Sequence, residues 1–436
     1  MSSWRAFVAG ALGPVTLACG GVQRAGSDGV ASAEAGNAGS SVHRELQQRA
    51  AELRRVPLDI EGRDRLVLEN FDGDVHVRAS DRAAPELMAH LGALALEPSQ
   101  GRRMLKRIEI VVERDGREVV LRLERPGPDQ ELFLTDSTYE LAVPRGMNVS
   151  VSTRPGRIEI LGPFRAARAT TSYGSVRVTN VAGDVFVDNG AGNVSVEGIA
   201  GGSIDVDTHD GDIEILGVQG EHVHAHSGSG DVRLWSVVAE DVTLICSHGA
   251  LAVEGLRGSL IARDTSGSVT LSDIEGGTVE VLAREADVVI RRATCALRIE
   301  TNAGHVSLHD ATGDVQVTSV HGNIHATGVF RSFDAVTKSG DVRVEARRGS
   351  VLEGTWHLES RYQDVELELP ADLAFELQAH TLYGKIEPEF PLVVEAGRTS
   401  RENSLRGSIN GGGTVVTLRS VIGSVRLLRG PRRPPR

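Results

Sequence analysis

A short alternation of apolar and polar residues recurs at regular intervals between Thr170 and Val344. Each copy reads glycine, a small or polar residue, an aliphatic residue, any residue and a second aliphatic residue, as in residues 174–178, 211–215 and 313–317. In such an alternation the aliphatic side chains point to one face of an extended strand and the intervening residues to the other. The pattern therefore predicts short strands, each with one buried face, that begin just after a glycine.

The glycines that introduce these strands have a fixed period. Successive glycines, or the residues that replace them, lie about nine or ten positions apart, and every second one follows a tripeptide rich in Thr and Ser. The repeating unit is therefore a pair of strands of about eighteen residues, and a fixed period of this kind indicates a repeat architecture. The first residues of the pairs are Gly174, Gly192, Gly211, Gly230, Gly249, Gly267, Ala286, Gly304, Gly322 and Gly340.

The length of the unit restricts the fold. A βαβ crossover needs more than ~30 residues, so two strands in about eighteen residues fit one coil of a parallel β-solenoid instead. We predict an all-β fold, a single-stranded parallel β-helix of about ten coils of 18–19 residues with irregular β caps at both ends. One column of its core is expected to contain Val176, Val194, Ile213, Val232, Leu251, Val269, Val288, Val306, Ile324 and Val342.

Outside the regular repeat the β pattern is less even. Apolar alternation flanks Asp115-Gly116, which predicts a type I′ hairpin, and a short helix is expected to begin at Pro85. After Gly349 the spacing widens and prolines appear. The predicted parts are an N-terminal β-rich cap over 57–150, the regular solenoid over 151–349, a C-terminal β cap over 350–428 and a disordered basic tail over 429–436.

The N-terminus has the features of a secretion signal. Residues 1–18 combine Arg5 with an apolar run over 6–18, which is too short to span a bilayer as a permanent helix. The sequence Thr-Leu-Ala-Cys-Gly over residues 16–20 resembles the lipobox of bacterial lipoproteins, which predicts that Cys19 is lipidated. The alternative is a plain secretory signal cut near Ala18.

The next segment is expected to separate the anchor from the folded body. Residues 19–56 are rich in Gly, Ala and Ser at first, which predicts a flexible tether. Within it, residues 43–55 contain good helix formers and predict a short helix.

Charge and cysteine content exclude some classes of function. The formal net charge of −12 disfavours binding to nucleic acid, whose phosphates need a basic surface. Three cysteines do not form a disulfide framework. Cys246 and Cys295 lie almost three coils apart, roughly 13 Å along the stack, beyond the ~7 Å between Cα atoms that a disulfide bridges. We expect both to be buried thiols.

The alternating phrases at residues 171–178 and 181–187 resemble a known family. They are similar to the adhesin-like β-solenoid domains of bacterial envelope proteins, some of which are called head-GIN or toastrack domains. The resemblance covers roughly residues 65–428. It implies a right-handed single-stranded β-helix and a location outside the cytoplasm. It supplies no catalytic residues.

The sequence gives little support for catalysis. It contains no Gly-x-Ser-x-Gly elbow, no HExxH zinc motif and no Walker loop. Enzymes built on β-helices form their clefts from long loops, whereas the coils here keep a nearly constant length. We therefore predict that the protein is not an enzyme and needs no cofactor.

One group of polar residues suggests a metal site. Their positions in the repeat place them on one solvent face of successive coils, where imidazole and carboxylate groups could bind a divalent metal ion. The alternative is a solvated polar face without a ligand. The candidate ligands are Asp205, Asp207, His222, His224 and His226, with Asp184, Asp188 and Asp241 beside them; His305, His309 and His325 form a looser group on the other face.

These features predict an adhesin-like scaffold for binding or display, held in the bacterial envelope through Cys19. The expected partners are a membrane, through the lipid anchor, and an envelope or extracellular glycan or protein. The expected location is the outer membrane or cell surface, or the periplasm or medium if the chain is not lipidated. The alternative functions are a self-associating structural element of the envelope and a carbohydrate-active β-helix enzyme.

Overall fold

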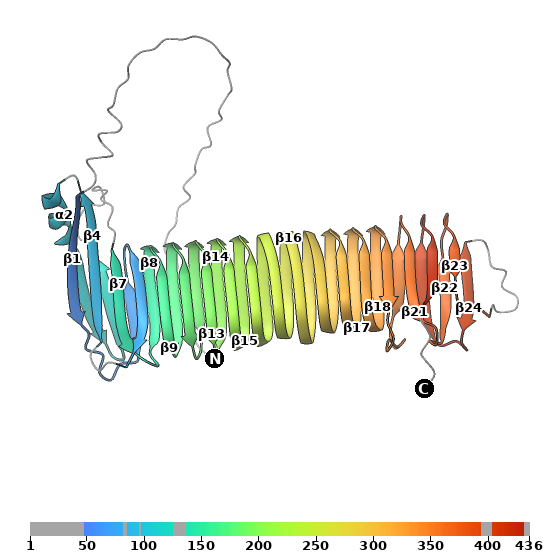
Figure 1. Ribbon diagram of the computed structural model, residues 1–436, viewed down its shortest axis with the longest axis horizontal. Helices are drawn as coiled ribbons and strands as arrows, with labels where there is room; N and C mark the ends of the chain where they lie inside the picture. Colours follow the sequence, from blue (N-terminus) through green and yellow to red (C-terminus); the bar gives the residue numbers. More distant parts are fainter. Residues whose placement is uncertain (1–47, 82–84, 96, 125–136, 394–402, 431–436) are drawn as a thin grey trace, which may run out of the picture. The chain divides into compact units, whose positions relative to one another are not determined.

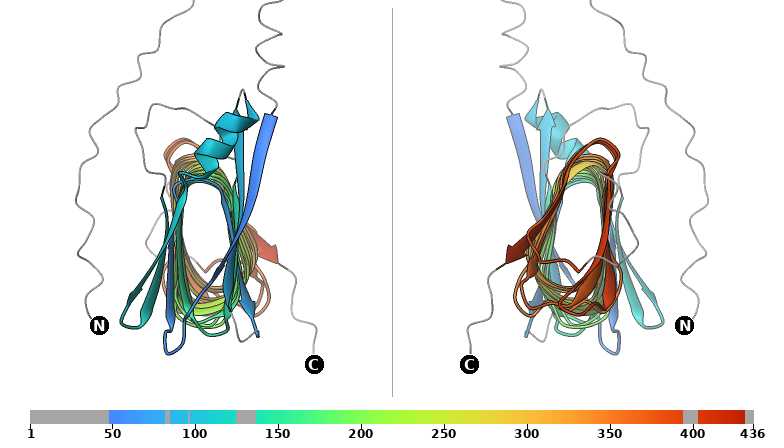
Figure 2. Two further views of the ribbon diagram at one scale, coloured as in Figure 1. Left: turned by 90° about the vertical axis from the view of Figure 1, so that its left-hand side faces the viewer. Right: turned by 90° about the vertical axis from the view of Figure 1, so that its right-hand side faces the viewer.

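The computed structural model describes residues 48–430, apart from 82–84, 96, 125–136 and 394–402. In these residues nearly every element is a β-strand, and the strands follow one another as a stack of coils (Figure 1). Seen along the stack, the coils superpose as a narrow ring with two long walls (Figure 2). The predicted signal peptide, its lipidated Cys19 and the basic tail after residue 430 lie outside the described residues.

Each coil in the regular part contributes one strand to each wall. The first wall contains β8 (Asn148–Pro155), β10 (Ala166–Tyr173), β12 (Val185–Ala191) and β14 (Ser203–Asp210). The second wall contains β9 (Ile158–Phe164), β11 (Val176–Val181), β13 (Val194–Ile199) and β19 (Val342–Ala346). Four longer strands run through the corners and supply both walls: β15 (Ile213–Ser229), β16 (Val232–Ala303), β17 (Val306–His321) and β18 (Ile324–Ser339).

Parallel pairing in register aligns the core residues. Val176 pairs with Val194, Val194 with Ile213 and Ile213 with Val232, and each of these side chains is buried. Because this register holds on both walls, aliphatic side chains from the two walls fill the interior. Burial of each side chain stabilises the folded state by about 2 kcal/mol. The predicted parallel β-solenoid and its core column are confirmed.

At the N-terminal end the order of the coils in space differs from their order in the sequence. β2 (Arg65–Glu69) pairs in parallel with both β8 and β6 (Glu118–Glu124), and β3 (Asp74–Ser80) pairs with both β9 and β7 (Thr138–Pro144). The first coil in the sequence is therefore inserted between the coil of β6 and β7 and the coil of β8 and β9. The end is closed by antiparallel strands β5 (Glu109–Asp115), β4 (Glu86–Ala95) and β1 (Gln48–Pro57), with the helix α2 (Pro98–Leu105) beside β1 and β4.

The C-terminal end uses the same arrangement. The regular walls continue into β20 (Trp356–Ser360) and β21 (Val365–Pro370). The last coil of the sequence, β25 (Thr414–Ser420) with β26 (Val425–Gly430), lies between that coil and the coil of β22 (Phe375–His380) and β23 (Ile386–Pro388). β24 (Ser404–Ile409) then pairs antiparallel with β22. Both ends thus cover a strand edge that would otherwise be open to pairing.

Two local predictions near the N-terminus are wrong. The helix expected over residues 43–55 is replaced, from Gln48 onward, by strand β1, and the helix expected from Pro85 is replaced by strand β4. In β4 the alternate residues Leu87, Ala89 and Leu91 are buried, so pairing with its neighbours decides the conformation over local helix propensity. The helix α2 begins at a later proline, Pro98.

The predicted hairpin is confirmed, but its turn type is not. β5 and β6 pair antiparallel with Asp115 opposite Glu118, so Gly116 and Arg117 form the turn. Of these two residues Gly116 alone has a positive φ, whereas a type I′ turn needs both. The N-terminal region predicted as an irregular cap also contains two coils in register with the solenoid, because β2 and β3, and β6 and β7, continue the two walls.

Candidate functional site

The repeated Thr/Ser residues form a ladder of hydrogen bonds inside one corner of the solenoid. This corner follows each first-wall strand and is called the glycine corner, after Gly174, Gly192 and their equivalents. Ser227 Oγ donates to the carbonyl oxygen of Gly211, one coil back, at 2.9 Å, and Ser360 Oγ donates to that of Gly340 at 2.8 Å. Both hydroxyls are buried. These polar residues therefore satisfy backbone carbonyls inside the fold and are not free for a ligand.

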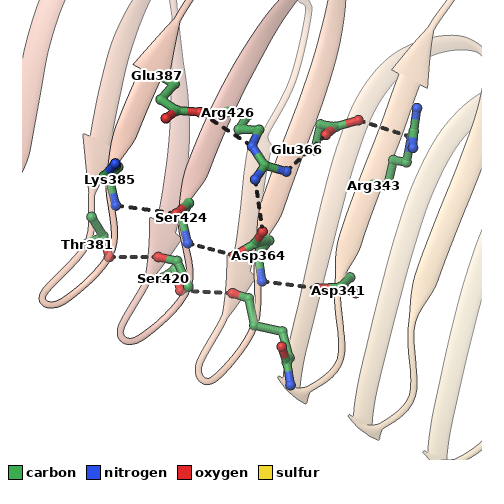
Figure 3. A network of polar contacts seen from close by, with 12 residues as sticks. Asp341, Arg343, Asp364, Glu366, Thr381, Lys385, Glu387, Ser420, Ser424 and Arg426 are labelled. Carbon is green, nitrogen blue, oxygen red and sulfur yellow. Dashed lines mark hydrogen bonds and ion pairs between the residues drawn. The ribbon is translucent and has the colours of Figure 1, made fainter.

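In many coils the residue after the corner glycine belongs to a second ladder, on the outside of the same corner. Asn193 Oδ1 accepts a hydrogen bond from the Asp212 amide at 3.1 Å, and Asp212 Oδ1 accepts one from the Asp231 amide at 2.9 Å. Figure 3 shows the ladder near the C-terminal end, where Asp341 accepts from the Asp364 amide and Asp364 from the Ser424 amide. The Gly-Asp-Val phrase is thus explained by coil stacking.

Several positions in the inner ladder lack this hydrogen bond: Ala283 has no hydroxyl, and the buried Thr301 and Ser319 hydroxyls have no partner. Asp264 is the acidic residue among them. Asp264 is buried, and neither carboxylate oxygen has a hydrogen-bond partner at ordinary distance. Burial raises the pKa of Asp264 to about 6, although the Ser266 amide and His248 favour its charged form. The preceding ladder position is Cys246, a buried thiol whose Sγ lies 3.3 Å from the carbonyl oxygen of Gly230. Cys295 is also a free thiol but is only partly buried.

The residues proposed as metal ligands lie side by side on the outer surface of the first wall. In register, Asp205 is opposite His224, Asp207 is opposite His226, and His222 is opposite Asp241. They interact as pairs: His226 Nδ1 lies 3.2 Å from Asp207 Oδ2, and His222 Nδ1 lies 3.4 Å from Asp241 Oδ2. Within the described part of the chain, no three His, Cys, Asp or Glu side chains converge in a way that could hold a metal ion.

The neighbouring acidic residues Asp188 and Asp184 have different surroundings. Asp188 is opposite Asp207, and burial, with the nearby Asp207 carboxylate, raises the pKa of Asp188. Asp184 lies in a turn, where its Oδ1 accepts a hydrogen bond from the Ser203 amide at 2.9 Å. The looser histidine group is also divided: the rings of His309 and His325 lie 6.3 Å apart edge to face, whereas His305 belongs to the outer ladder of the glycine corner.

An ion-pair network joins the intercalated C-terminal coil to both of its neighbours. Arg426 on β26 lies 3.4 Å from Asp364 and 3.6 Å from Glu366 on one side, and 3.5 Å from Glu387 on the other (Figure 3). Arg343 extends the row with a 3.1 Å contact to Glu366. Arginine therefore separates carboxylates that successive coils place close together.

We expect Arg426→Ala to lower the free energy of unfolding by about 1 kcal/mol, because three carboxylates lose their shared cation while solvent screens part of the effect. Chemical denaturation at low salt measures this loss, which should shrink in high salt. Arg177→Ala is the matched control, since Arg177 makes a single exposed contact of 3.4 Å with Glu197. Equal effects of the two substitutions would contradict the shared role of Arg426.

The glycine corner also carries a hollow that the sequence did not indicate. It has a volume of about 570 Å³ and is lined mainly by polar side chains and corner glycines. Its polar lining includes Asp287, His305, His321, Asn323, Asp341 and Gln363. Next to Gln363 stands the exposed Tyr362, so polar and aromatic groups meet at this part of the corner. No motif marks these residues, because they come together only through the stacking of coils.

Comparison with known families agrees with this geometry. The model described as Toastrack DUF4097 matches the chain twice, over residues 63–259 and over residues 239–428. The chain belongs to the Toastrack family. The two matches overlap in the middle of the solenoid. The intercalated coil at the N-terminal end lies in the first match, and the one at the C-terminal end lies in the second.

Two solved structures are among those similar to this Toastrack chain. A "putative cell adhesion protein" from Clostridium sporogenes has 9% identity and a TM-score of 0.17, covering 87% of this chain and 100% of its own. A "putative adhesin" from Parabacteroides merdae has 12% identity and a TM-score of 0.22, covering 69% of this chain and 97% of its own. No curated protein matches the sequence. Within residues 48–430, where described, no helix is both long and apolar enough to cross a membrane.

Proposed function

We propose that this Toastrack protein is a non-catalytic scaffold of the bacterial envelope, which presents the outer faces and corners of a rigid solenoid for adhesin-like binding. The observation that carries the proposal is the in-register pairing of the core residues from coil to coil. From Val149 to Val187 on the first wall, and from Ile158 to Val232 on the second, each core residue pairs with its equivalent in the next coil. Such a stack holds surface side chains in fixed columns, which suits recognition of an extended partner.

Attachment to the envelope rests on the sequence of the N-terminus. The apolar run over 6–18 followed by Cys19 fits a lipoprotein signal, and the segment after it supplies a tether between the lipid and the solenoid.

We expect wild-type protein expressed in a bacterial host to incorporate a labelled fatty acid and to sediment with membranes, and Cys19→Ala to do neither. A Cys246→Ala variant is the control, because Cys246 is buried in the solenoid and far from the signal sequence. If wild-type protein takes up no label, the proposed lipid anchor is wrong, and the protein is then exported in soluble form.

The two alternative functions make different predictions. A self-associating envelope element would elute from a size-exclusion column at a volume that depends on protein concentration, whereas a display scaffold would not. The antiparallel strands β1, β5 and β24 near the ends of the stack favour the display scaffold, because they cover the parallel strands that end-to-end stacking would need. A carbohydrate-active enzyme would shorten a glycan during incubation, which chromatography of the products detects.

A further inference from the structure

A row of exposed apolar side chains marks the glycine corner in the last three coils. We call Tyr362, Ile422, Leu382 and Tyr383 the tyrosine ridge; their exposed fractions are 39%, 49%, 47% and 76%. The coils are adjacent, because the Ile422 amide donates to the Arg361 carbonyl at 3.3 Å and the Tyr383 amide donates to the Val421 carbonyl at 3.0 Å. Tyr362, Ile422 and Tyr383 therefore occupy the same place in three successive coils.

At this end of the described corner, exposed apolar side chains follow one another in adjacent coils, whereas Tyr173, which precedes Gly174, stands singly near the other end. In the coils before it, the equivalent place is mostly polar, with Asp210, Ser229, His248, Ser266, Glu285, His321 and Ser339. The backbone beneath the ridge is also held firmly. Thr381 Oγ1 donates to the Gly423 carbonyl at 2.9 Å, and Ser420 Oγ donates to the Gln363 carbonyl at 2.9 Å. The tyrosine rings thus project from a fixed support, which lowers the entropy lost when a ligand binds.

The ridge continues directly into the polar hollow. Gln363 lines the hollow and is the neighbour of Tyr362, so aromatic and hydrogen-bonding groups form one strip along the glycine corner. In the hollow, His305, His321 and Asn323 offer imidazole and amide groups from successive coils. Asp287 and Asp341 add carboxylates and make the strip unfavourable for an acidic ligand.

We propose that this strip binds an extended, uncharged polysaccharide. The C–H groups on the face of a sugar ring are attracted to the negative face of an aromatic ring. Tyr383 offers the more exposed ring, whereas the Arg361 guanidinium lies over one face of the Tyr362 ring, 5.5 Å from its centroid, so Tyr362 would offer its other face. At a coil spacing of ~4.8 Å the two tyrosines stand roughly 10 Å apart along the stack, which suits sugar rings that follow one another in an extended chain. The hydroxyl groups of the next sugars would then face the polar hollow.

A protein partner fits the same strip less well. The ridge is a convex row three coils long, whereas a specific protein interface buries about 800 Å² on each side. The proposal rests on the proposed function and names the ligand class that the scaffold would recognise.

The test is sedimentation of the full-length protein with insoluble cellulose, chitin or xylan, with alginate beads as the acidic comparison. We expect at least one of the uncharged matrices to retain the protein, and alginate to retain none. Tyr383→Ala and Tyr362→Ala should each weaken retention about tenfold. Tyr173→Ala is the matched control: Tyr173 precedes a corner glycine and is 67% exposed, but it lies near the other end of the solenoid. All three variants should keep the wild-type melting midpoint.

The outcomes separate this proposal from the proposed function. Retention on none of the uncharged matrices, or equal retention of Tyr383→Ala and wild type, overturns the polysaccharide site. Binding to whole envelopes that protease treatment abolishes and Tyr383→Ala leaves unchanged indicates a protein partner, which overturns the polysaccharide site but keeps the scaffold function. Absence of binding to both envelopes and glycans overturns both.

Discussion

Gly211→Ala is expected to destabilise the solenoid by about 3 kcal/mol or more, because a Cβ at this corner has no space. Gly211 has φ of +150°, and an added Cβ would overlap the carbonyl oxygen of Gly192 in the coil beneath. The obstacle is backbone, which cannot rotate away as a side chain can. The two coils would have to separate at the point where Asn193 accepts from the Asp212 amide and Thr208 Oγ1 donates to the Gly192 carbonyl, so the loss includes hydrogen bonds as well as strain.

Gly217→Ala is the matched control for that experiment. Gly217 has φ of +63°, but nothing lies within 4 Å of an added Cβ, so only the backbone conformation is unfavourable, at a cost of about 1 kcal/mol. Equivalent places in other coils hold Asn180, Ser236 and Asp273 with similar φ values, which shows that this corner accepts side chains. Chemical denaturation followed by circular dichroism compares the two variants. A loss for Gly211→Ala no greater than that for Gly217→Ala would contradict the steric explanation.

The regular part of the fold could be predicted because the two-residue alternation of apolar positions and the eighteen-residue repeat both indicate the same stack of coils. The alternation in residues such as Val194 and Val196 fixes which side chains face inward, and the longer period fixes which coil neighbours meet. The same reasoning placed Asp207 and His226 on one solvent face of successive coils, and the register sets the two residues opposite each other. What it could not give was the rotamer and partner of each side chain, and these decide whether donors converge on a metal ion or form pairs.

The ends could not be predicted, because the order of the coils in space departs from their order in the sequence. Nothing in the local pattern of β2 and β3 indicates that they pair on both sides with strands later in the chain. The tyrosine ridge has the same origin: Ile422 comes after Tyr383 in the sequence but lies between Tyr362 and Tyr383 in the stack. Spacing alone therefore could not align these three residues.

Asp264 should make the stability of the protein fall as pH rises. Burial raises its pKa from 3.8 to about 6 in the folded protein, so the folded state holds this proton to higher pH than the unfolded chain. The stability that Asp264 contributes is therefore complete below about pH 4, is lost between pH 4 and 6, and stays lost above, a change of about 3 kcal/mol. The ladder gives a reason: a neutral carboxyl has an O–H that can donate to a carbonyl, as Ser227 does, and a carboxylate has none.

Asp264→Ser tests this, because serine supplies the hydroxyl that other coils have at the same place. We expect the variant to be more stable than wild type by about 2–3 kcal/mol at pH 8 and nearly equal to it at pH 4, as measured by denaturation across the pH range. Among the groups near Asp264, Cys246 stays a neutral thiol, because burial first, and then the carboxylates of Asp264 and Asp231, raise its pKa to about 11. Because a charge on His248 also acts on Asp264, wild type and variant are compared in a His248→Gln background. A stability difference that stays the same from pH 4 to pH 8 would show that Asp264 is already charged in the fold, and that the coils tolerate a buried carboxylate without a partner.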